Sequence, residues 1–470
     1  MKYEFDAIVI GLGPAGMAVS IMGAEMGLKI CAIEKRAIGG ECMNIGCIPS
    51  KAMLKMARAR ATVGELEKLA MAPLPLPDVQ NPFAKIAADL KYIGEAKNKK
   101  MFEKVHLVLG EGAAEFIDSH TVAVGGRRYT AKRIYICTGT RPAVPPITGL
   151  DQLEILTNEN VFHLDRIPES MTIIGGGAIG CEMAQAFTRL GCRCAIVHMD
   201  ARLLPLGDTD LGAALEQAFQ REEIPVYNGR HIRNVEKRAD GQVVLTTEEG
   251  DELVAERLLV AAGRSSVHAS LQLDKAGVQF DKRKIPVDKY LRTSQKNIFA
   301  CGDCNGHSLF THAAMHQGML AIMNSMIPGP FKIDYRKFVV PWTVFTTPMI
   351  SQVGRSRQEL EQAGVRFEEV TCKYEDYGAA IAENIAEGYV SAYITPTGRI
   401  LGAKIVGEGS GEMIGEWALA IQKKLRITDI MMLQHSFPTM SFLTKRVSET
   451  WMMGMMKSER IKNLCRFMFR

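Results

Sequence analysis

The sequence contains no stretch that is both long and apolar enough to span a bilayer. Its apolar run near the N-terminus, residues 7–24, lacks a basic leader and contains Gly11, Gly13, Pro14 and Gly16, which argues against a signal peptide. Lys and Arg number 57 against 52 Asp and Glu, with no concentrated basic face, so nucleic-acid binding is not expected. The 11 cysteines are odd in number and scattered, which does not fit a secreted disulfide framework and favours a reducing, cytoplasmic setting.

The length of the chain sets the expected number of domains. A chain of 470 residues is too long for one ordinary hydrophobic core, so two or three domains are expected. Residues 51–105 are mostly helical in pattern and are interrupted by the proline-rich loop 73–77. From about residue 338 the pattern changes to hairpin-like strands and then to amphipathic helices, which indicates a distinct C-terminal domain.

The N-terminal segment predicts a strand–helix–strand unit. Residues 4–10 are typical of a buried strand and are followed by a Gly-rich turn. A helix then runs to about Met26, and a second strand from Lys29 ends at Glu34. The turn carries the dinucleotide-binding pattern Gly11-Leu-Gly13-Pro-Ala-Gly16. Its glycines let the backbone approach a pyrophosphate at the helix N-terminus, and Glu34 can accept hydrogen bonds from both ribose hydroxyls.

A second pattern of the same kind follows the strand that opens at Met171 and precedes a helix: Gly175-Gly-Gly177-Ala-Ile-Gly180. Two dinucleotide sites imply two cofactors, one of which can be a flavin that relays electrons from the other. The next strand ends at His198, where an NAD-specific site places an acid. The missing acid and the nearby Arg202 favour NADPH slightly over NADH, and a purely structural role for His198 is the alternative.

The most specific signal is the segment Gly39–Lys51, in which four residues separate Cys42 from Cys47. In an ideal helix, residues five apart rise about 7.5 Å along the axis, which is beyond comfortable disulfide geometry. The segment must therefore tighten, and Gly46 supplies the freedom to do so. A disulfide that closes so small a loop is expected to be reducible rather than structural. Two buried thiols, or a metal pair that lacks its other two ligands, are the alternatives.

Together with Thr293-x4-Ile-Phe-Ala-Cys-Gly-Asp303, these motifs resemble the class I pyridine nucleotide–disulfide oxidoreductases over essentially the whole chain. That family includes dihydrolipoamide dehydrogenase, glutathione reductase and mercuric reductase. The resemblance implies an α/β fold with two nested Rossmann-like dinucleotide-binding domains and a C-terminal α+β dimerisation domain. We expect an FAD-binding domain at 1–143 and 264–337, an NAD(P)-binding domain at 144–263 and the dimerisation domain at 338–470.

The resemblance also implies roles for individual residues. Cys42 would be the interchange thiol that faces the substrate, and Cys47 would form a charge-transfer contact with the flavin. Lys51 would lie near flavin N5 and pair with Glu182, which avoids an unpaired buried charge. Asp303 would bind the flavin ribityl chain. The other expected cofactor contacts are Gly11, Gly13, Gly16, Glu34, Gly40, Gly112, Thr138 and Gly139 for FAD, and Gly175, Gly177, Ile179, Gly180, His198 and Gly263 for NAD(P).

The C-terminal pattern departs from that of the dihydrolipoamide dehydrogenases. Those enzymes end in His-x-His-Pro-Thr-x-x-Glu, whose second His and final Glu form the acid–base dyad. Phe437 holds the His position here and Phe442 holds the Glu position, and neither can move a proton. Loss of the base is expected to slow oxidation of a dithiol by roughly 10²–10⁴-fold. His435 lies two residues earlier, about 6.5 Å away in an extended segment, so its use as a substitute base is an alternative.

The tail departs from other family members as well. Mercuric reductases lack the dyad and carry a pair of cysteines at the C-terminus, whereas this tail holds only Cys465. Reactive-chlorine-resistance flavin reductases, which keep the paired cysteines without the dyad, are a similar match. The tail from Trp451 is rich in Met, Lys and Arg, and we favour its packing against a partner subunit over contact with a membrane surface. The pairs Cys301/Cys304 and Cys192/Cys194 are interpreted as small buried residues.

These observations predict an FAD-dependent enzyme that passes electrons from NADPH or NADH through FAD and the Cys42/Cys47 pair to a small-molecule acceptor. The acceptor is expected to be a metal ion, a quinone or a small disulfide rather than lipoamide. We expect a homodimer whose active site is shared between subunits. The alternatives are a dihydrolipoamide dehydrogenase with a displaced acid–base group and a low-turnover, redox-responsive flavoprotein that acts as a binding component.

Overall fold

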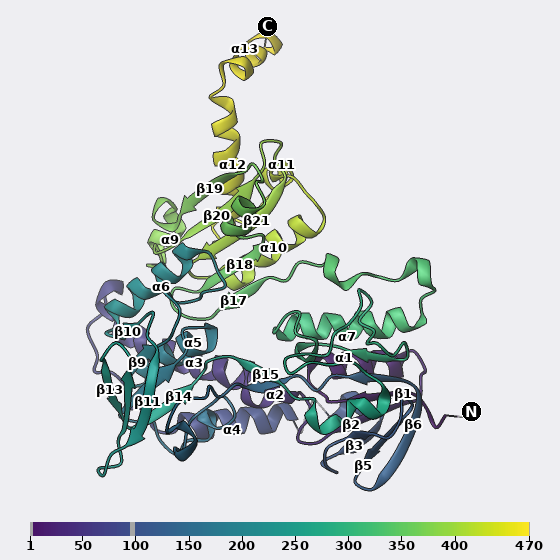
Figure 1. Cartoon of the computed structure of the whole chain (residues 1–470). Coiled ribbons are helices and arrows are strands. Elements are labelled where there is room, and N and C mark those ends of the chain that lie inside the picture. The colour runs from purple at the N-terminus through teal and green to yellow at the C-terminus, as the bar shows by residue number, and fades with distance from the viewer. Residues whose placement is uncertain (1–2, 95–98, 470) are drawn as a thin grey trace. The chain divides into compact units, whose positions relative to one another are not determined.

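The computed structural model describes residues 3–94 and 99–469. The chain forms two compact units (Figure 1). The first comprises the chain up to Met56 together with Asp78–Gly175 and Ile232–Lys337, and the second comprises Ala57–Pro77, Gly176–His231 and Phe338 onward. The expected domain boundaries stay predictions. Across the described ranges, no helix is long and apolar enough to cross a membrane.

A seven-stranded sheet forms the centre of the first unit. Its order is β3-β2-β1-β6-β5-β4, with β16 also paired to the long strand β6. The strands β1, β2, β3, β6 and β16 run parallel, and β5 and β4 extend the sheet antiparallel. Their bounds are β1 Phe5–Ile10, β2 Ile30–Glu34, β3 His106–Leu109, β4 Glu115–Phe116, β5 Thr121–Val124, β6 Arg127–Ile136 and β16 Ile298–Ala300. Buried aliphatic side chains of these strands form the core of the unit.

Two helices of small residues pack closely beside this sheet: α1 (Pro14–Glu25) and α7 (Thr311–Met326) (Figure 1). A Cβ atom added to Gly318 of α7 would lie 2.3 Å from the carbonyl oxygen of Ala15 in α1, so only glycine permits this approach. The predicted strand–helix–strand unit at the N-terminus is confirmed, since β1, α1 and β2 begin and end within one or two residues of the expected positions.

The region 51–105 is only partly helical. The helix α3 (Cys47–Val63) runs from the first unit into the second, and a short 3-10 helix follows at Leu66–Leu69. The proline-rich loop comes next, as expected, and α4 begins at Pro82 and ends at Ile93. Residues 95–98 lie outside the described residues.

The remaining strands of the first unit form smaller groups. The strands β8 and β14 pair in parallel, β7 and β15 pair antiparallel, and β11, β12 and β13 form an antiparallel sheet. The bounds are β7 Thr140–Pro142, β8 Ser170–Ile174, β11 Ile232–Lys237, β12 Val243–Thr247, β13 Glu252–Ala255, β14 Arg257–Val260 and β15 Arg264–Ser266.

The second unit holds the rest of the second nucleotide-binding pattern and the C-terminal sheet. The helices and strands after Gly176 are α5 Ala178–Arg189, β9 Arg193–Val197, α6 Thr209–Arg221 and β10 Val226–Tyr227. The C-terminal sheet is antiparallel, in the order β17-β18-β21-β20-β19. Its elements are β17 Trp342–Val344, β18 Ile350–Gly354, α8 Arg357–Gln362, β19 Glu368–Lys373, α9 Gly378–Ala382, β20 Tyr389–Ile394 and β21 Ile400–Val406. The final helices are α10 Ser410–Gln422, α11 Ile427–Met432, α12 Phe442–Met456 and α13 Glu459–Met468.

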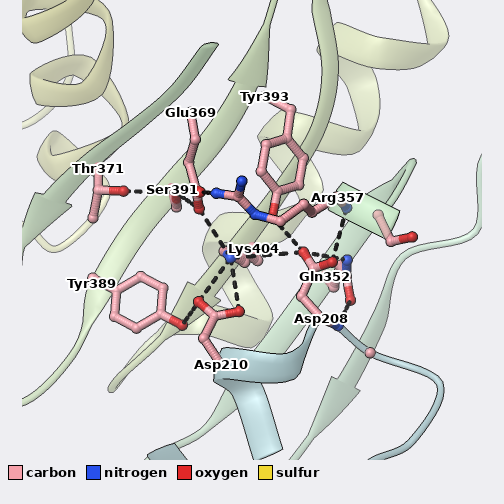
Figure 2. A network of polar contacts seen from close by, with 12 residues as sticks. Asp208, Asp210, Gln352, Arg357, Glu369, Thr371, Tyr389, Ser391, Tyr393 and Lys404 are labelled. Carbon is pink, nitrogen blue, oxygen red and sulfur yellow. Dashed lines mark hydrogen bonds and ion pairs between the residues drawn. The ribbon is translucent and has the colours of Figure 1, made fainter. Parts of the chain in front are cut away.

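A buried lysine ties α6 to the C-terminal sheet. Lys404 of β21 is only 2% exposed. Its Nζ lies 2.7 Å from an oxygen of Asp210, 2.9 Å from Glu369 and 3.8 Å from Asp208 (Figure 2). Removing an ammonium group from water costs several kcal/mol unless opposite charges and hydrogen bonds replace the solvent, and three carboxylates do so here.

These carboxylates have further donors from the same sheet. Tyr393 donates to Asp208 and Tyr389 donates to Asp210, each at 2.5 Å (Figure 2). Burial alone would raise the pKa of Asp210, but the hydrogen bonds from Lys404 and Tyr389 outweigh it and hold that pKa below its usual value. Because α6 begins directly after Asp208, the network fixes the start of this helix.

We expect Lys404→Met to lower the free energy of unfolding by about 3–5 kcal/mol, because it leaves buried carboxylates without their cation. Urea unfolding measures this loss. The folded-state pKa of Asp210 lies below the ordinary 3.8, so its contribution is present above that pH and is lost as the pH falls. The free energy of unfolding of the Lys404→Met variant should therefore fall less steeply with decreasing pH than that of the unaltered protein.

The matched control is Lys373→Met on β19, the edge strand of the same sheet. The Nζ of Lys373 lies 2.7 Å from Glu375, but its side chain is 62% exposed, so its removal should leave the unfolding midpoint nearly unchanged. Equal losses in the two variants would contradict the special role of the buried lysine.

Candidate active site

The first Gly-rich loop is packed against the end of β6. A Cβ at Gly11 would lie 2.5 Å from the Cys137 carbonyl oxygen, and Gly11 has a φ of +92°, which favours glycine. A Cβ at Gly16 would lie 1.8 Å from the carbonyl oxygen of Gly11. The free N–H groups at the start of α1 are therefore brought to the loop, as a pyrophosphate site requires.

Glu34 lies beside this loop at the end of β2. The N–H groups of Leu12 and Arg36 donate to its two carboxylate oxygens, each at 2.8 Å. The side chain is buried and therefore fixed at the edge of the loop. Each oxygen keeps a lone pair that a ribose hydroxyl can use, so the arrangement fits the predicted role of Glu34.

The cysteine segment is a broken helix. The helix α2 (Gly40–Ile45) ends before Gly46, and α3 begins at Cys47. A Cβ at Gly46 would lie 2.9 Å from the carbonyl oxygen of Glu41, so glycine is required by this close approach. The break at Gly46 confirms the expected tightening of the segment.

The break brings the two thiols together. The Cys42 thiol is hydrogen bonded to Cys47, and this contact together with burial raises the pKa of Cys42 well above its usual value. Both cysteines are in the thiol form and partly exposed. The pair therefore has the contact that reversible disulfide formation needs.

Cys47 lies at two helix starts. It is the first residue of α3, and its Sγ lies 3.3 Å from the hydroxyl of Thr311, the first residue of α7. Helix N-termini favour negative charge, and a hydroxyl donor favours a thiolate over a thiol. These features favour a thiolate at Cys47 over a thiol, and Thr311 and Lys51 also lower the pKa of Cys42, against the larger opposite effect of the Cys47 contact and burial.

A polar cluster surrounds Asp303. Its carboxylate accepts a hydrogen bond from the hydroxyl of Thr140 (3.1 Å), and Arg264 lies 3.9 Å away and is also paired with Glu41. Burial raises the pKa of Asp303, opposed by Arg264 and Thr140. The buried hydroxyl of Thr138 finds no hydrogen-bond partner among the described residues, which fits a site completed by a bound polar group such as a flavin chain.

The remaining expected residues are placed as follows. Lys51 lies one turn beyond Cys47 on α3, and Glu182, on α5, is 4% exposed and accepts the Phe345 N–H at 3.0 Å. Lys51 belongs to the first unit and Glu182 to the second, so their pairing stays a prediction. A Cβ atom added to Gly40 would lie 2.7 Å from the Cα atom of Gly13, so the cysteine segment lies against the first dinucleotide loop. Gly112 follows β3, Gly139 lies between β6 and β7, and Gly263 precedes β15.

The second Gly-rich loop runs from Gly175 to Gly177, and α5 begins at Ala178. Gly177 has open space where a Cβ would lie, and Ile179 is 41% exposed, so both can contact a bound dinucleotide. Gly180 is buried. These features fit the predicted NAD(P) contacts.

His198 does not face solvent. Its ring lies against the second loop, since a Cβ at Gly176 would be 2.7 Å from it, and Nε2 lies 2.5 Å from Asn228 Oδ1. Arg202 donates to the carbonyl oxygens of Pro205 (3.1 Å) and Gly207 (2.9 Å), so those donors are already used. Both positions thus contribute to the loop structure.

Asp200 is the charged group that the sequence reading missed. Its carboxylate lies 3.8 Å from His198 Nδ1, and its side chain is 53% exposed. It follows β9 by three residues, so an acid is present near the nucleotide loop even though the strand itself ends in histidine. The negative charge of Asp200 would repel the 2′-phosphate of NADPH, which opposes the expected preference for NADPH.

The C-terminal segment carries an aromatic cluster of Tyr377, Phe437 and Phe442. The rings of Phe437 and Phe442 meet edge to face with centroids 5.4 Å apart, and Tyr377 stacks on Phe442 at 6.0 Å. Phe437 is 71% exposed. The side chain of His435 is 5% exposed, and its Nε2 lies 3.0 Å from Glu416 of α10, whereas its Nδ1 finds no hydrogen-bond partner among the described residues.

Two family models match the chain. Residues 5–318 match the pyridine nucleotide-disulphide oxidoreductase family, and residues 340–446 match the dimerisation domain of that family. The chain therefore belongs to the pyridine nucleotide-disulphide oxidoreductases. The expected family and the α/β fold class are confirmed.

Relatives of different activity are similarly close. The chain is 31% identical over 461 residues to a mercuric reductase of Streptomyces lividans, covering 95% of this chain and 96% of the relative. It is 32% identical over 446 residues to a dihydrolipoyl dehydrogenase of Thermus scotoductus, covering 93% and 95%. The Cu(II) complex of the HOCl-induced flavoprotein disulfide reductase RclA from Escherichia coli matches with a TM-score of 0.85 at 25% identity, covering 96% of this chain and 99% of that chain.

Family membership establishes the general activity. The chain is an oxidoreductase enzyme, its cofactors are FAD and a nicotinamide dinucleotide, and its dimerisation domain supports a homodimer. The names of these relatives indicate different substrates, so the acceptor of this chain must be inferred from its own residues.

Thr311 was not predicted from the sequence, because it lies 264 positions from Cys47 and matches no local motif.

We expect NAD(P)H, added anaerobically, to produce a long-wavelength charge-transfer band that requires the Cys47 thiolate. Cys47→Ser should abolish the band. Thr311→Val should shift its pH midpoint upward by about one unit, because the thiolate loses a hydrogen-bond donor.

The control for the second variant is Thr62→Val, on the exposed part of α3. The Thr62 hydroxyl donates to the Arg58 carbonyl oxygen, so its loss should leave the band and its pH midpoint unchanged. A band that persists in Cys47→Ser would show that the thiolate contact is assigned to the wrong cysteine.

We expect Asp200→Asn to raise kcat/KM for NADPH about fivefold and to change that for NADH little, because a carboxylate about 4 Å from a phosphate costs about 1 kcal/mol in water. Steady-state rates with each donor measure this. Asp240→Asn, in the exposed turn before β12, is the matched control. Parallel changes with both donors would remove Asp200 from the specificity argument.

Proposed function

We propose that the enzyme passes electrons from NAD(P)H to the Cys42/Cys47 pair and on to an acceptor that needs no proton from the protein. A soft metal ion bound by the thiols is the favoured acceptor, and dihydrolipoamide is a poor substrate. The observation that carries the proposal is the aromatic pair Phe437–Phe442, 5.4 Å apart, where the family resemblance places an acid–base dyad.

Because Phe437 and Phe442 cannot accept a proton, reactions that need a base are distinguished from reactions that do not. Oxidising a substrate dithiol requires a base that removes a proton as each thiolate forms. Neither phenylalanine can do so, and the side chain of His435, paired with Glu416 through Nε2, is only 5% exposed to a substrate in solvent. Reducing a divalent mercury or copper ion consumes electrons only, so the missing base costs nothing in that reaction.

The thiols supply the ligands that such an ion prefers. Thiolates select soft metal ions over hard ones. In the proposed site Cys42 receives the ion from solvent, and Cys47, held by Thr311 and two helix starts, provides the second sulfur. FAD, when bound, would supply the relay of electrons from NAD(P)H, first to reduce a Cys42–Cys47 disulfide to two thiols and then to reduce the metal ion that these thiols hold. The names of two relatives, a mercuric reductase and a Cu(II) complex, are consistent with this class of acceptor.

The same reasoning extends to the assembly and its setting. We propose a homodimer in which the exposed Phe437 belongs to an active site shared with the partner subunit. The odd number of cysteines and their scatter along the sequence favour a reducing, cytoplasmic setting.

We expect dihydrolipoamide oxidation to be at least about 100-fold slower than NAD(P)H-driven reduction of Hg(II) or Cu(II). Restoring the dyad by Phe437→His together with Phe442→Glu should raise dihydrolipoamide activity about 10²-fold and leave metal reduction unchanged. Steady-state rates with each acceptor measure both effects.

The control is Phe331→His, at an exposed position outside the aromatic cluster, which should change neither rate. The proposal fails if the unaltered enzyme oxidises dihydrolipoamide as fast as it reduces its best metal acceptor. His435 or another base would then be at work.

A further inference from the structure

The C-terminal helix α13 forms an exposed extension of α12 (Figure 1). It contains no buried residue, and it lies beyond residue 446, where the dimerisation-domain match ends. Leu464 is 57% exposed, Met468 is 76% exposed, and Phe467 is 75% exposed. An exposed set of large apolar side chains marks a surface that another apolar phase or partner covers.

The apolar side chains of α13 share one face. Ile461, Leu464, Cys465 and Met468 follow the spacing i, i+3, i+4 and i+7, so they form a stripe along the helix. Phe467 borders that stripe. The opposite side carries Glu459, Lys462, Asn463 and Arg466, which are bonded among themselves, with Lys462 Nζ 2.7 Å from Glu459 and Arg466 donating to Asn463 at 3.1 Å. The helix is therefore strongly amphipathic although most of its length is polar.

The charge of the segment identifies the kind of surface that fits. Between Lys457 and Phe469 there are four basic side chains and one carboxylate. This excess of positive charge makes two copies of the segment repel each other, whereas an anionic surface attracts it. A basic, amphipathic, Phe- and Leu-bearing helix instead matches the surface of an anionic bilayer, into which the apolar face sinks while Lys and Arg meet the lipid phosphates.

We propose that α13 docks the enzyme on anionic lipid membranes, with Ile461, Leu464 and Met468 inserted at the headgroup boundary. The helix lies in the interface and does not span the bilayer. This reverses the preference from sequence alone for partner packing, because the structure places the apolar stripe and the basic residues on opposite sides of an exposed helix. The proposal does not depend on the identity of the electron acceptor.

The test is co-sedimentation of the FAD-loaded, full-length enzyme with vesicles. Phosphatidylcholine vesicles containing phosphatidylglycerol should bind the enzyme, and pure phosphatidylcholine vesicles should bind it far more weakly. Leu464→Glu with Met468→Glu should abolish sedimentation. Lys462→Gln with Arg466→Gln should weaken binding to the anionic vesicles about 25-fold, at about fivefold for each charge removed.

The matched control is Leu74→Glu, at a 61%-exposed position in the proline-rich loop, which should sediment like the unaltered enzyme. All variants should keep the same NAD(P)H consumption with a soluble acceptor. Failure of the unaltered enzyme to sediment with the anionic vesicles overturns the proposal. So does dissociation of the Leu464→Glu, Met468→Glu dimer, measured by light scattering, because it would assign the face to the partner chain.

Discussion

Contact of backbone against backbone around the first Gly-rich loop is the constraint on which the first unit depends. Gly16 approaches the carbonyl oxygen of Gly11, Gly11 approaches that of Cys137, and Gly40 approaches Gly13. A methyl group at any of these places would separate α1 from the sheet or move the cysteine segment away from the loop. The absence of side chains at these glycines thus fixes both the loop expected to meet the cofactor phosphates and the start of the cysteine segment.

The two units carry different parts of the chemistry. In the first unit, Cys47 lies at the start of two helices and beside a hydroxyl, so a negative sulfur is favoured there. In the second unit, Phe437 and Phe442 stand where the family resemblance places proton-transferring side chains, and the hydroxyl of the neighbouring Tyr377 donates to the Thr439 carbonyl oxygen. The proposed preference for acceptors that need no base follows from this C-terminal segment and leaves the residues expected to bind the flavin unchanged.

Local patterns predicted the parts of the fold that depend on neighbouring residues. The bounds of β1, α1 and β2 and the break at Gly46 followed from strand periodicity, glycine positions and disulfide geometry. Thr311, Asp200 and the Lys404 network did not, because their partners come from segments far apart in the chain. Cys47 and Thr311 are 264 residues apart, and Lys404 and Asp210 are 194 apart. Their meeting is a product of tertiary packing, on which hydrophobic pattern and turn residues carry no information.

Helix α6 begins directly after Asp208, and the loop before it carries Asp200 and Arg202, close to the second Gly-rich loop. The same Asp208 is held by Tyr393 and approached by Lys404 from the C-terminal sheet. The segment expected to influence the choice of nicotinamide donor is therefore not a detachable module. A chimaera in which residues 176–231 come from another reductase would place a foreign loop against the buried Lys404 without its matched carboxylates. An exchange meant to transfer cofactor preference must therefore include Lys404, Tyr389 and Tyr393.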